Sequence, residues 1–278
     1  MESEREVSKA GYLRESYHYF HLRDTAGQER DFHFHEFDKL VLLLAGRVDY
    51  TVESSTYALR PWDVLLVKHH TIHKALIDKS EPYERIIIYF DRSFFERALP
   101  GARLMASFDA ADERGSYLLT PKEGQLEELK AAVEAYERAA SDERPGAQSM
   151  RETMVIQLLI HVSRMAEAGP SGEYLCDDPK IRGVLSYINE NLRSELSVEA
   201  LAERAYLSRY HFMRLFKAQT GSTVHAYVRQ KRLLSAARLI REGVPAGKAA
   251  LDSGFADYSA FHRAFRESFG MSPGSLKK

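Results

Sequence analysis

Two segments of this chain, residues 207–221 and 256–270, repeat one short pattern at an offset of 49 positions. In each segment, a residue that can cap a helix is followed by two phenylalanines, basic residues and a closing glycine. The matched pairs are Ser208/Asp257, Phe212/Phe261, Arg214/Arg263, Phe216/Phe265, Lys217/Arg266 and Gly221/Gly270. A capping side chain begins a helix and a glycine ends it, so the pattern predicts two short helices with an apolar face and a basic face.

A second short helix is expected before each of these two. In the first copy Ser197 can cap a helix whose apolar face is Val198, Leu201 and Ala205, and in the second copy the helix starts at Ala246. Two short helices joined by a tight turn, with a basic outer face, indicate a helix-turn-helix DNA-binding unit. We expect the second helices to bury two triplets at helical spacing, Phe212, Leu215 and Phe216, and Phe261, Ala264 and Phe265.

The amphipathic stretch Val224–Arg241 connects the two copies. At about 1.5 Å per residue, a continuous helix of this length measures roughly 27 Å. Such a spacer would place two recognition helices in successive major-groove segments on one face of DNA, about 34 Å apart.

Charge is distributed unevenly along the chain. Residues 180–278 contain 17 Lys and Arg and 8 Asp and Glu, whereas the preceding residues contain 22 and 32. A basic C-terminal region beside an acidic N-terminal region favours contact of the former with nucleic acid.

The C-terminal region, from Ile181 to Leu276, resembles the DNA-binding domain of AraC-type transcription regulators. The resemblance rests on both helix-turn-helix patterns, on residues 229–233 of the linking helix, on Gly254-Phe255, and on the spacing Phe261, Phe265, Gly270 and Pro273. The chain departs from the family at Tyr206, where glycine is common, and at Ala246 and Ala249, where isoleucines are usual. The resemblance implies DNA contacts by Arg209, Tyr210, Met213, Arg214, Lys217, Ser259, His262, Arg263 and Arg266. Of these, we expect Arg214 to read a base, and Lys217 and Arg266 to neutralise phosphates.

The N-terminal half has short apolar runs separated by turn-forming residues, which indicates antiparallel β structure in a small barrel or sandwich. The runs are Phe32–Phe37, Leu40–Leu44, Val48–Val52, Tyr57–Leu59, Val64–Val67 and Arg85–Phe90. Thr120 and Pro121 then predict the start of a helix, and a second helix follows Pro145-Gly146. The predicted fold class is therefore α+β.

Domain boundaries follow from these changes of pattern. We predict an N-terminal arm over residues 1–20, a barrel domain over 21–117 and a helical hairpin over 118–168, which is a candidate for dimerisation. A linker over residues 169–179 leads to the DNA-binding domain over 180–278. The dense apolar run Val155–Ile160 either faces another subunit or packs against the β domain.

Histidines are concentrated in the barrel region. His33 and His35 share one face of an extended segment, and Gly46, Asp63, His69-His70 and His73 follow. Residues 20–92 resemble the cupin-like sensor domain often fused to AraC-type DNA-binding regions. Metal-binding cupins have a glutamate where this chain has Lys39, whose charge opposes a divalent cation, so no metal is predicted. Zinc on His33, His35 and His73 stays open as an alternative.

The resemblance implies that the barrel binds a small effector, such as a sugar or a carboxylate. The candidate binding residues are His33, His35, Lys39, Tyr50, His73 and Tyr89. Their side-chain directions depend on strand register, which the sequence does not determine.

The sequence therefore predicts an effector-controlled transcription regulator, an activator that binds double-stranded DNA as a homodimer and acts on RNA polymerase. No enzymatic activity and no cofactor are predicted. A single cysteine and the lack of any apolar run near about 18 residues indicate a cytoplasmic protein that does not cross a membrane. The alternatives are a metal-dependent cupin enzyme with a DNA-binding tail and a monomeric coactivator with little sequence preference.

Overall fold

The computed structural model describes residues 13, 15–24, 32–53, 55–99, 101–167, 169 and 176–276. The chain divides into two compact units, residues 1–176 and 177–278, called here the β unit and the helical unit. Most of the predicted arm (1–20) and of the predicted linker (169–179) lies outside the described residues. In the described ranges, we find no helix with the length and hydropathy of a membrane-spanning segment.

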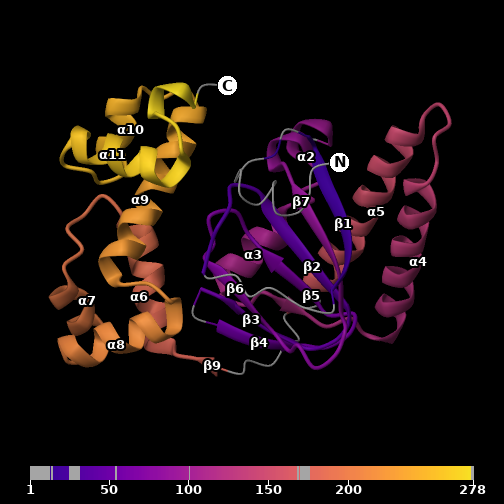
Figure 1. The fold of residues 1–278 in the computed structure, drawn as a ribbon, viewed down its shortest axis with the longest axis horizontal. Helices are drawn as coiled ribbons and strands as arrows, with labels where there is room; N and C mark the ends of the chain where they lie inside the picture. Colours follow the sequence, from indigo (N-terminus) through magenta and orange to yellow (C-terminus); the bar gives the residue numbers. More distant parts are fainter. Residues whose placement is uncertain are drawn as a thin grey trace. The chain divides into compact units, whose positions relative to one another are not determined.

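Antiparallel strands in two sheets make up the first part of the β unit (Figure 1). One sheet has the strand order β1-β7-β2-β5-β8, and the other has β6, β3 and β4 side by side. The strands are β1 (Tyr17–Asp24), β2 (Asp38–Ala45), β3 (Val48–Val52), β4 (Ser55–Leu59), β5 (Val64–Val67), β6 (His73–Ile77), β7 (Tyr83–Phe90), β8 (Leu118–Leu119) and β9 (Cys176–Asp177).

The central strands β2, β5 and β7 are buried on both faces, which explains why their sequences are apolar without alternation. Leu40 of β2 pairs with Ile88 of β7 on one side and with Leu66 of β5 on the other. One apolar core contains side chains from both sheets. The predicted α+β class, with an N-terminal β structure, is confirmed.

Two expectations about the first strands need correction. β1 begins at Tyr17, inside the segment predicted as an arm. The run Phe32–Phe37 is not a strand, because His33 forms only an isolated bridge with His73, with N–O distances of 3.0 and 2.9 Å. The ladder of β2 begins only at Asp38.

Among the described residues of the β unit, two helices lie between β7 and β8 and two more follow β8. They are α2 (Arg92–Ala98), α3 (Ala106–Arg114), α4 (Glu123–Ala140) and α5 (Ala147–Glu167). The helices α2 and α3 were not predicted from the sequence. The start of α4 lies later than the predicted start at Thr120 and Pro121, because the Thr120 hydroxyl bonds to Asp63 and does not cap the helix. The backbone N–H of Lys122, at the N-cap, donates to the Gln125 side chain at 3.0 Å.

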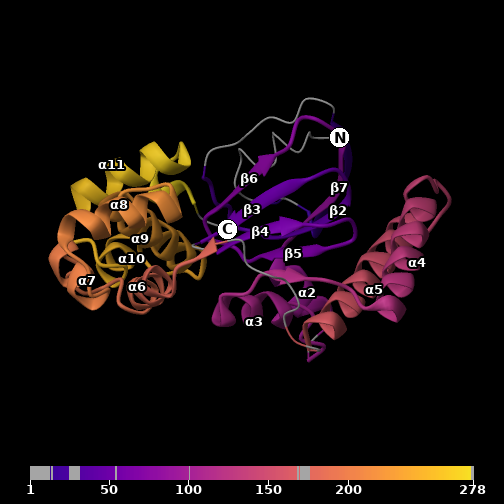
Figure 2. The same ribbon diagram turned by 90° about the horizontal axis from the view of Figure 1, so that it is seen from below.

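The predicted helical hairpin is formed by α4 and α5, which lie side by side in both views of the molecule (Figures 1 and 2). Tyr136 of α4 stacks on Tyr19 of β1 with ring centroids 3.9 Å apart, so the hairpin packs on the edge of the first sheet. In the dense run of α5, Val155, Leu158 and Leu159 are buried and Ile160 is exposed. Most of this run therefore belongs to the core of the unit.

The helical unit contains the elements predicted from the repeated pattern. Its helices are α6 (Pro179–Glu190), α7 (Val198–Arg204), α8 (Arg209–Thr220), α9 (Val224–Arg241), α10 (Ala246–Asp252), α11 (Tyr258–Phe269) and the 3₁₀ helix η1 (Pro273–Ser275). The predicted caps Ser197, Ser208 and Asp257 each accept a hydrogen bond from the first turn of their helix. The connecting helix α9 has the predicted bounds.

Candidate functional site

The first predicted recognition helix, α8, is fixed by its ends and by its apolar face. The Ser208 hydroxyl accepts a hydrogen bond from the N–H of His211 at 3.4 Å, and Gly221 ends the helix with φ of +69°. Phe212 and Phe216 are fully buried, whereas Leu215, which was expected in the core, is half-buried. This anchoring directs the remaining face of α8 outward.

Of the nine residues predicted to contact DNA, five lie on the outward face of α8. Tyr210, Met213, Arg214 and Lys217 are exposed. Arg209 is also exposed, and its Nε lies 3.1 Å from Oε1 of Glu199 on α7. Within the described part of the chain, neither Arg214 nor Lys217 forms an ion pair. Their charges are therefore available to an anionic partner.

The second predicted recognition helix, α11, is built in the same way. Asp257 accepts hydrogen bonds from the N–H groups of Ser259 at 3.2 Å and Ala260 at 2.7 Å. The expected triplet of Phe261, Ala264 and Phe265 is buried. Ser259, Arg263 and Arg266 are exposed, while His262 is half-buried, with its ring centroid 6.2 Å from that of Tyr258.

The long helix α9 packs against both recognition helices. Near its first end, Tyr227 meets Phe216 of α8 at a ring centroid distance of 5.5 Å. Near its second end, Leu233, Ala237 and Ile240 share an apolar cluster with Phe261 and Phe265 of α11. With 18 residues, α9 is about 27 Å long, and α8 and α11 pack at different ends of it.

Some basic residues of the helical unit serve its own structure. Arg232 of α9 donates to the carbonyl oxygens of Leu192 and Ser194, both at 2.8 Å, and burial lowers its pKa. Arg193 lies 3.2 Å from the carboxylate of Asp252. Part of the positive charge of this unit is thus used in contacts within the unit and is not presented on the faces of α8 and α11.

In the β unit, the six predicted effector residues lie together, and we call them the histidine–lysine cluster: His33, His35, Lys39, Tyr50, His73 and Tyr89. The ring centroid of His73 lies 4.3 Å from that of His33 and 4.8 Å from that of His35. The Lys39 ammonium donates to the Tyr50 hydroxyl at 3.0 Å and lies 5.8 Å from the ring centroid of Tyr89. Strand register, which the sequence did not reveal, brings β2, β3, β6 and β7 together here.

Hydrogen bonds define the tautomers of two of these histidines. Nδ1 of His35 lies 2.6 Å from the carbonyl oxygen of Phe37, and Nδ1 of His73 lies 3.0 Å from that of Thr71. A carbonyl only accepts, so both Nδ1 atoms carry hydrogen and both Nε2 atoms are acceptors. Neither Nε2 atom has a hydrogen-bond partner within the described chain.

Burial, with the charges of Lys39 and His33, holds the pKa of His35 and His73 well below the ordinary value of 6.5. Both rings are therefore neutral at physiological pH. Neutral imidazole nitrogens also bind metals, but the Lys39 ammonium opposes a cation beside them. In the part of the chain that the structure describes, no group of three His, Cys, Asp or Glu side chains is arranged to hold a metal ion.

The pH dependence of stability follows from these two histidines. Between pH 7 and 5, His35 and His73 take up protons in the unfolded chain but not in the folded protein. The free energy of unfolding that they contribute is therefore fully present above about pH 6.5 and falls as the pH is lowered. Each histidine contributes a slope of up to about 1.4 kcal/mol per pH unit. Urea unfolding at pH 7, 6 and 5 measures this slope. His73→Gln is expected to reduce it, and the same slope in both proteins would refute the assignment.

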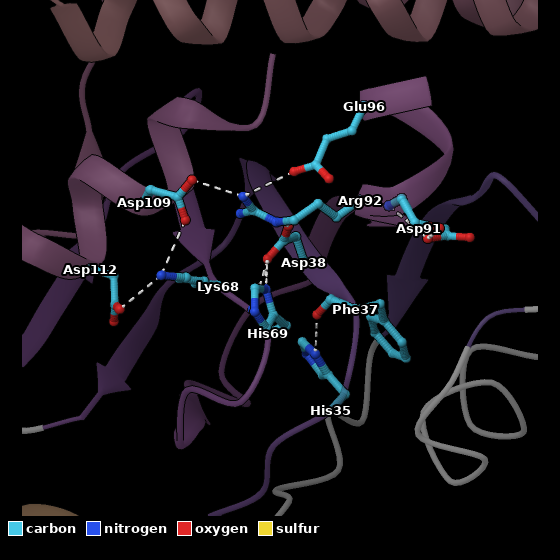
Figure 3. A network of polar contacts seen from close by, with 11 residues as sticks. His35, Phe37, Asp38, Lys68, His69, Asp91, Arg92, Glu96, Asp109 and Asp112 are labelled. Atoms are coloured by element: carbon cyan, nitrogen blue, oxygen red, sulfur yellow. Dashed lines mark hydrogen bonds and ion pairs between the residues drawn. The ribbon is translucent and has the colours of Figure 1, made fainter. Parts of the chain in front are cut away.

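A second polar group, which we call the Asp38 network, consists of Asp38, Lys68, His69, Arg92 and Asp109 (Figure 3, which also shows His35 of the cluster). Fully buried Asp38 of β2 accepts hydrogen bonds from the backbone and ring of His69, at 2.8 and 2.9 Å, and from Nε of Arg92, at 2.9 Å. Arg92 also donates to Asp109 of α3 at 2.8 Å, and Lys68 lies 3.1 Å from Asp109. The network thus connects β2, the turn before β6, α2 and α3.

Hydrogen bonding determines the charge of Asp38. Burial by itself would raise the pKa of this carboxyl, but the hydrogen bonds from His69 and the charges of His69 and Arg92 outweigh burial and lower it. The sequence offered one indication of this role: Asp38 and Lys39 are charged residues directly preceding the apolar run Leu40–Leu44. Arg92 of α2, which bonds to Asp38, and Asp109 of α3, which bonds to Arg92, had no such indication.

Comparison with known proteins gives two family matches. The family described as "AraC-like ligand binding domain" matches residues 16–159, and the one described as "Helix-turn-helix domain" matches residues 201–278. The chain is 27% identical to the probable transcriptional regulator LumQ of Photobacterium leiognathi, over 90% of this chain and 93% of LumQ. It is 23% identical to the transcriptional activator RhaR of Pectobacterium atrosepticum, over 88% of this chain and 85% of RhaR.

Among solved structures, the helical unit is similar to the DNA-binding domain of AdpA, a global transcriptional factor crystallised with a target DNA. The identity is 34%, over 36% of this chain and 89% of that domain, with a TM-score of 0.34.

Proposed function

This chain belongs to the AraC-type transcription regulators, and we propose that it reads specific DNA sequences with α8 and α11 under the control of a small-molecule effector bound in the β unit. One observation carries the proposal: two capped helices with exposed basic faces pack at different ends of a single connecting helix. The connecting helix is about 27 Å long, which is of the same order as the separation of about 34 Å between successive major-groove segments.

The effector is proposed to be a sugar or a carboxylate that contacts the histidine–lysine cluster. The Nε2 atoms of His35 and His73 are acceptors, which suit the hydroxyl groups of a polar ligand. The Lys39 ammonium is a donor, which suits a carboxylate or a hydroxyl oxygen. Binding controls transcription only if the effector has different affinities for two arrangements of the protein.

The α4–α5 hairpin is proposed as the dimer interface. Met150 and Ile160 on α5 are exposed apolar side chains, which support contact with a second copy of the chain. Because RhaR is named an activator, we further propose that this chain activates transcription, through contact with RNA polymerase.

An enzymatic role is the second candidate, because neutral imidazole nitrogens such as Nε2 of His35 and His73 are able to bind a metal ion. Metal analysis of the purified protein separates the two. Stoichiometric iron or manganese together with turnover would support an enzyme. Purified protein with neither bound metal nor turnover would support a regulator.

Selection of bound DNA from a random pool, performed with and without candidate sugars and carboxylates, tests the proposal. A recovered sequence with two conserved elements about one helical turn apart, and enrichment that changes with one ligand class, is the expected result. Recovery of unrelated sequences would contradict sequence-specific binding.

Substitutions on α8 separate base reading from phosphate contact. Arg214→Ala is expected to relax the preference at one base position by about 1–3 kcal/mol, because arginine reads guanine with two hydrogen bonds. Lys217→Ala is the matched control, expected to weaken binding to all sequences alike and to reduce the salt slope by about 1. Fluorescence titration with single-base variants of the selected duplex measures both. A uniform loss in Arg214→Ala would assign this residue to phosphate.

A further inference from the structure

Tyr206, in the turn between α7 and α8, combines a left-handed backbone with an outward side chain. Its φ is +55° and its side chain is 90% exposed. For a residue with a Cβ atom, a left-handed backbone conformation raises the free energy of the folded state. Glycine adopts the same conformation without this cost. Tyr206 therefore weakens the turn in which it lies, relative to glycine.

The second helix-turn-helix provides an internal comparison. In the first turn the N–H of Tyr206 donates to Glu203 O at 2.9 Å and that of Leu207 to Ala202 O at 3.0 Å. In the second, Gly254 donates to Leu251 O and Phe255 to Ala250 O, both at 3.0 Å. Gly254 has φ of +90°, so the same left-handed position is filled once by glycine and once by tyrosine.

Among the residues that the structure describes, none makes a contact that compensates for the left-handed backbone of Tyr206. Its ring makes no hydrogen bond and no aromatic contact with the described residues, and its exposure exceeds that of every other exposed large apolar or aromatic side chain described. The position itself is informative, because Tyr206 lies two residues before the Ser208 cap of α8. Exposed Arg209 and Tyr210 follow directly.

From this turn we infer that Tyr206 contacts the DNA backbone beside α8, with its hydroxyl donating a hydrogen bond to a phosphate oxygen. The inference rests on the proposed function and adds a contact that the repeated pattern does not contain. A phenol is neutral, so the contact adds affinity without releasing a counterion. It also makes the first helix-turn-helix a stronger DNA contact than the second, where Gly254 has no side chain.

The test measures stability and DNA binding of the full chain in three proteins: wild type, Tyr206→Gly and Tyr206→Phe. Tyr206→Gly is expected to raise the Tm of the helical unit by about 4 °C, because glycine removes the strain. The same variant is expected to bind both the selected and a random duplex about 3–10-fold more weakly, with an unchanged salt slope. Tyr206→Phe loses only the hydroxyl. It is expected to bind DNA as weakly as Tyr206→Gly and to keep the Tm of the wild type.

Arg103→Gly is the matched control, because Arg103 is an exposed residue of the β unit with φ of +48°. It is expected to raise stability and leave DNA affinity unchanged. Wild-type affinity for DNA in Tyr206→Gly would overturn the inference, and full affinity in Tyr206→Phe would overturn the phosphate hydrogen bond. Failure of the proposed function has a different signature, since wild type itself would then not distinguish the selected from the random duplex.

Discussion

Asp38→Ala is expected to lower the free energy of unfolding of the β unit by about 3–5 kcal/mol, because it removes one partner of a buried ion pair. Asp38 is fully buried and accepts hydrogen bonds from His69 and Arg92. Without it, the described acidic partners of the Arg92 guanidinium are Asp109 and, at 3.8 Å, Glu96. The loss is measured by urea unfolding of the full chain at pH 7, in which the unfolding transition of the β unit is monitored.

Glu134→Gln is the control for this substitution. Glu134 lies 3.7 Å from Arg138 on the exposed face of α4, a pair one helical turn apart. Such pairs contribute about 0.3–0.5 kcal/mol, so the control should hardly change the unfolding midpoint. Equal losses in the two variants would contradict a structural role for the Asp38 network.

Gly254→Ala is expected to destabilise the helical unit by about 3–5 kcal/mol, because a methyl group there combines backbone strain with a steric clash. Gly254 has φ of +90°, and an added Cβ would meet the Leu192 carbonyl oxygen and the Arg232 guanidinium. Arg232 itself holds that carbonyl by a hydrogen bond. Thermal unfolding of the full chain measures the effect.

Gly247→Ala is the matched control in the same unit. Gly247 lies in α10, and an added Cβ would meet no atom within 4 Å. Because alanine is the better helix former, this variant is expected to gain about 0.5–1 kcal/mol. If both glycine variants change the stability of the helical unit in the same direction, the steric clash expected at Gly254 would be contradicted.

The helical unit was predictable because its signals are local. Ser197, Ser208 and Asp257 cap the helices in which they were predicted, and the bounds of α9 match the amphipathic stretch. Leu215 was placed in the core by spacing alone, yet it is only half-buried, since spacing fixes a direction and not the depth of packing.

The β unit was harder to predict because its contacts join distant positions. The histidine–lysine cluster needs the register of β3 with β6, which places Tyr50 opposite Ala75 and Val52 opposite His73. A register shift of one residue would reverse the direction of every side chain. The helices α2 and α3 were not predicted, and neither was the pairing of Asp38 with Arg92 of α2.

Sequence-specific DNA binding by the full chain is the central property proposed for this protein. The direct measurement is the ratio of the dissociation constants for a random duplex and for a duplex recovered by selection, titrated by fluorescence anisotropy at one fixed salt concentration. We expect the selected duplex to bind at least about 10³-fold more tightly. A ratio below about tenfold would contradict the account and would favour a coactivator with little sequence preference.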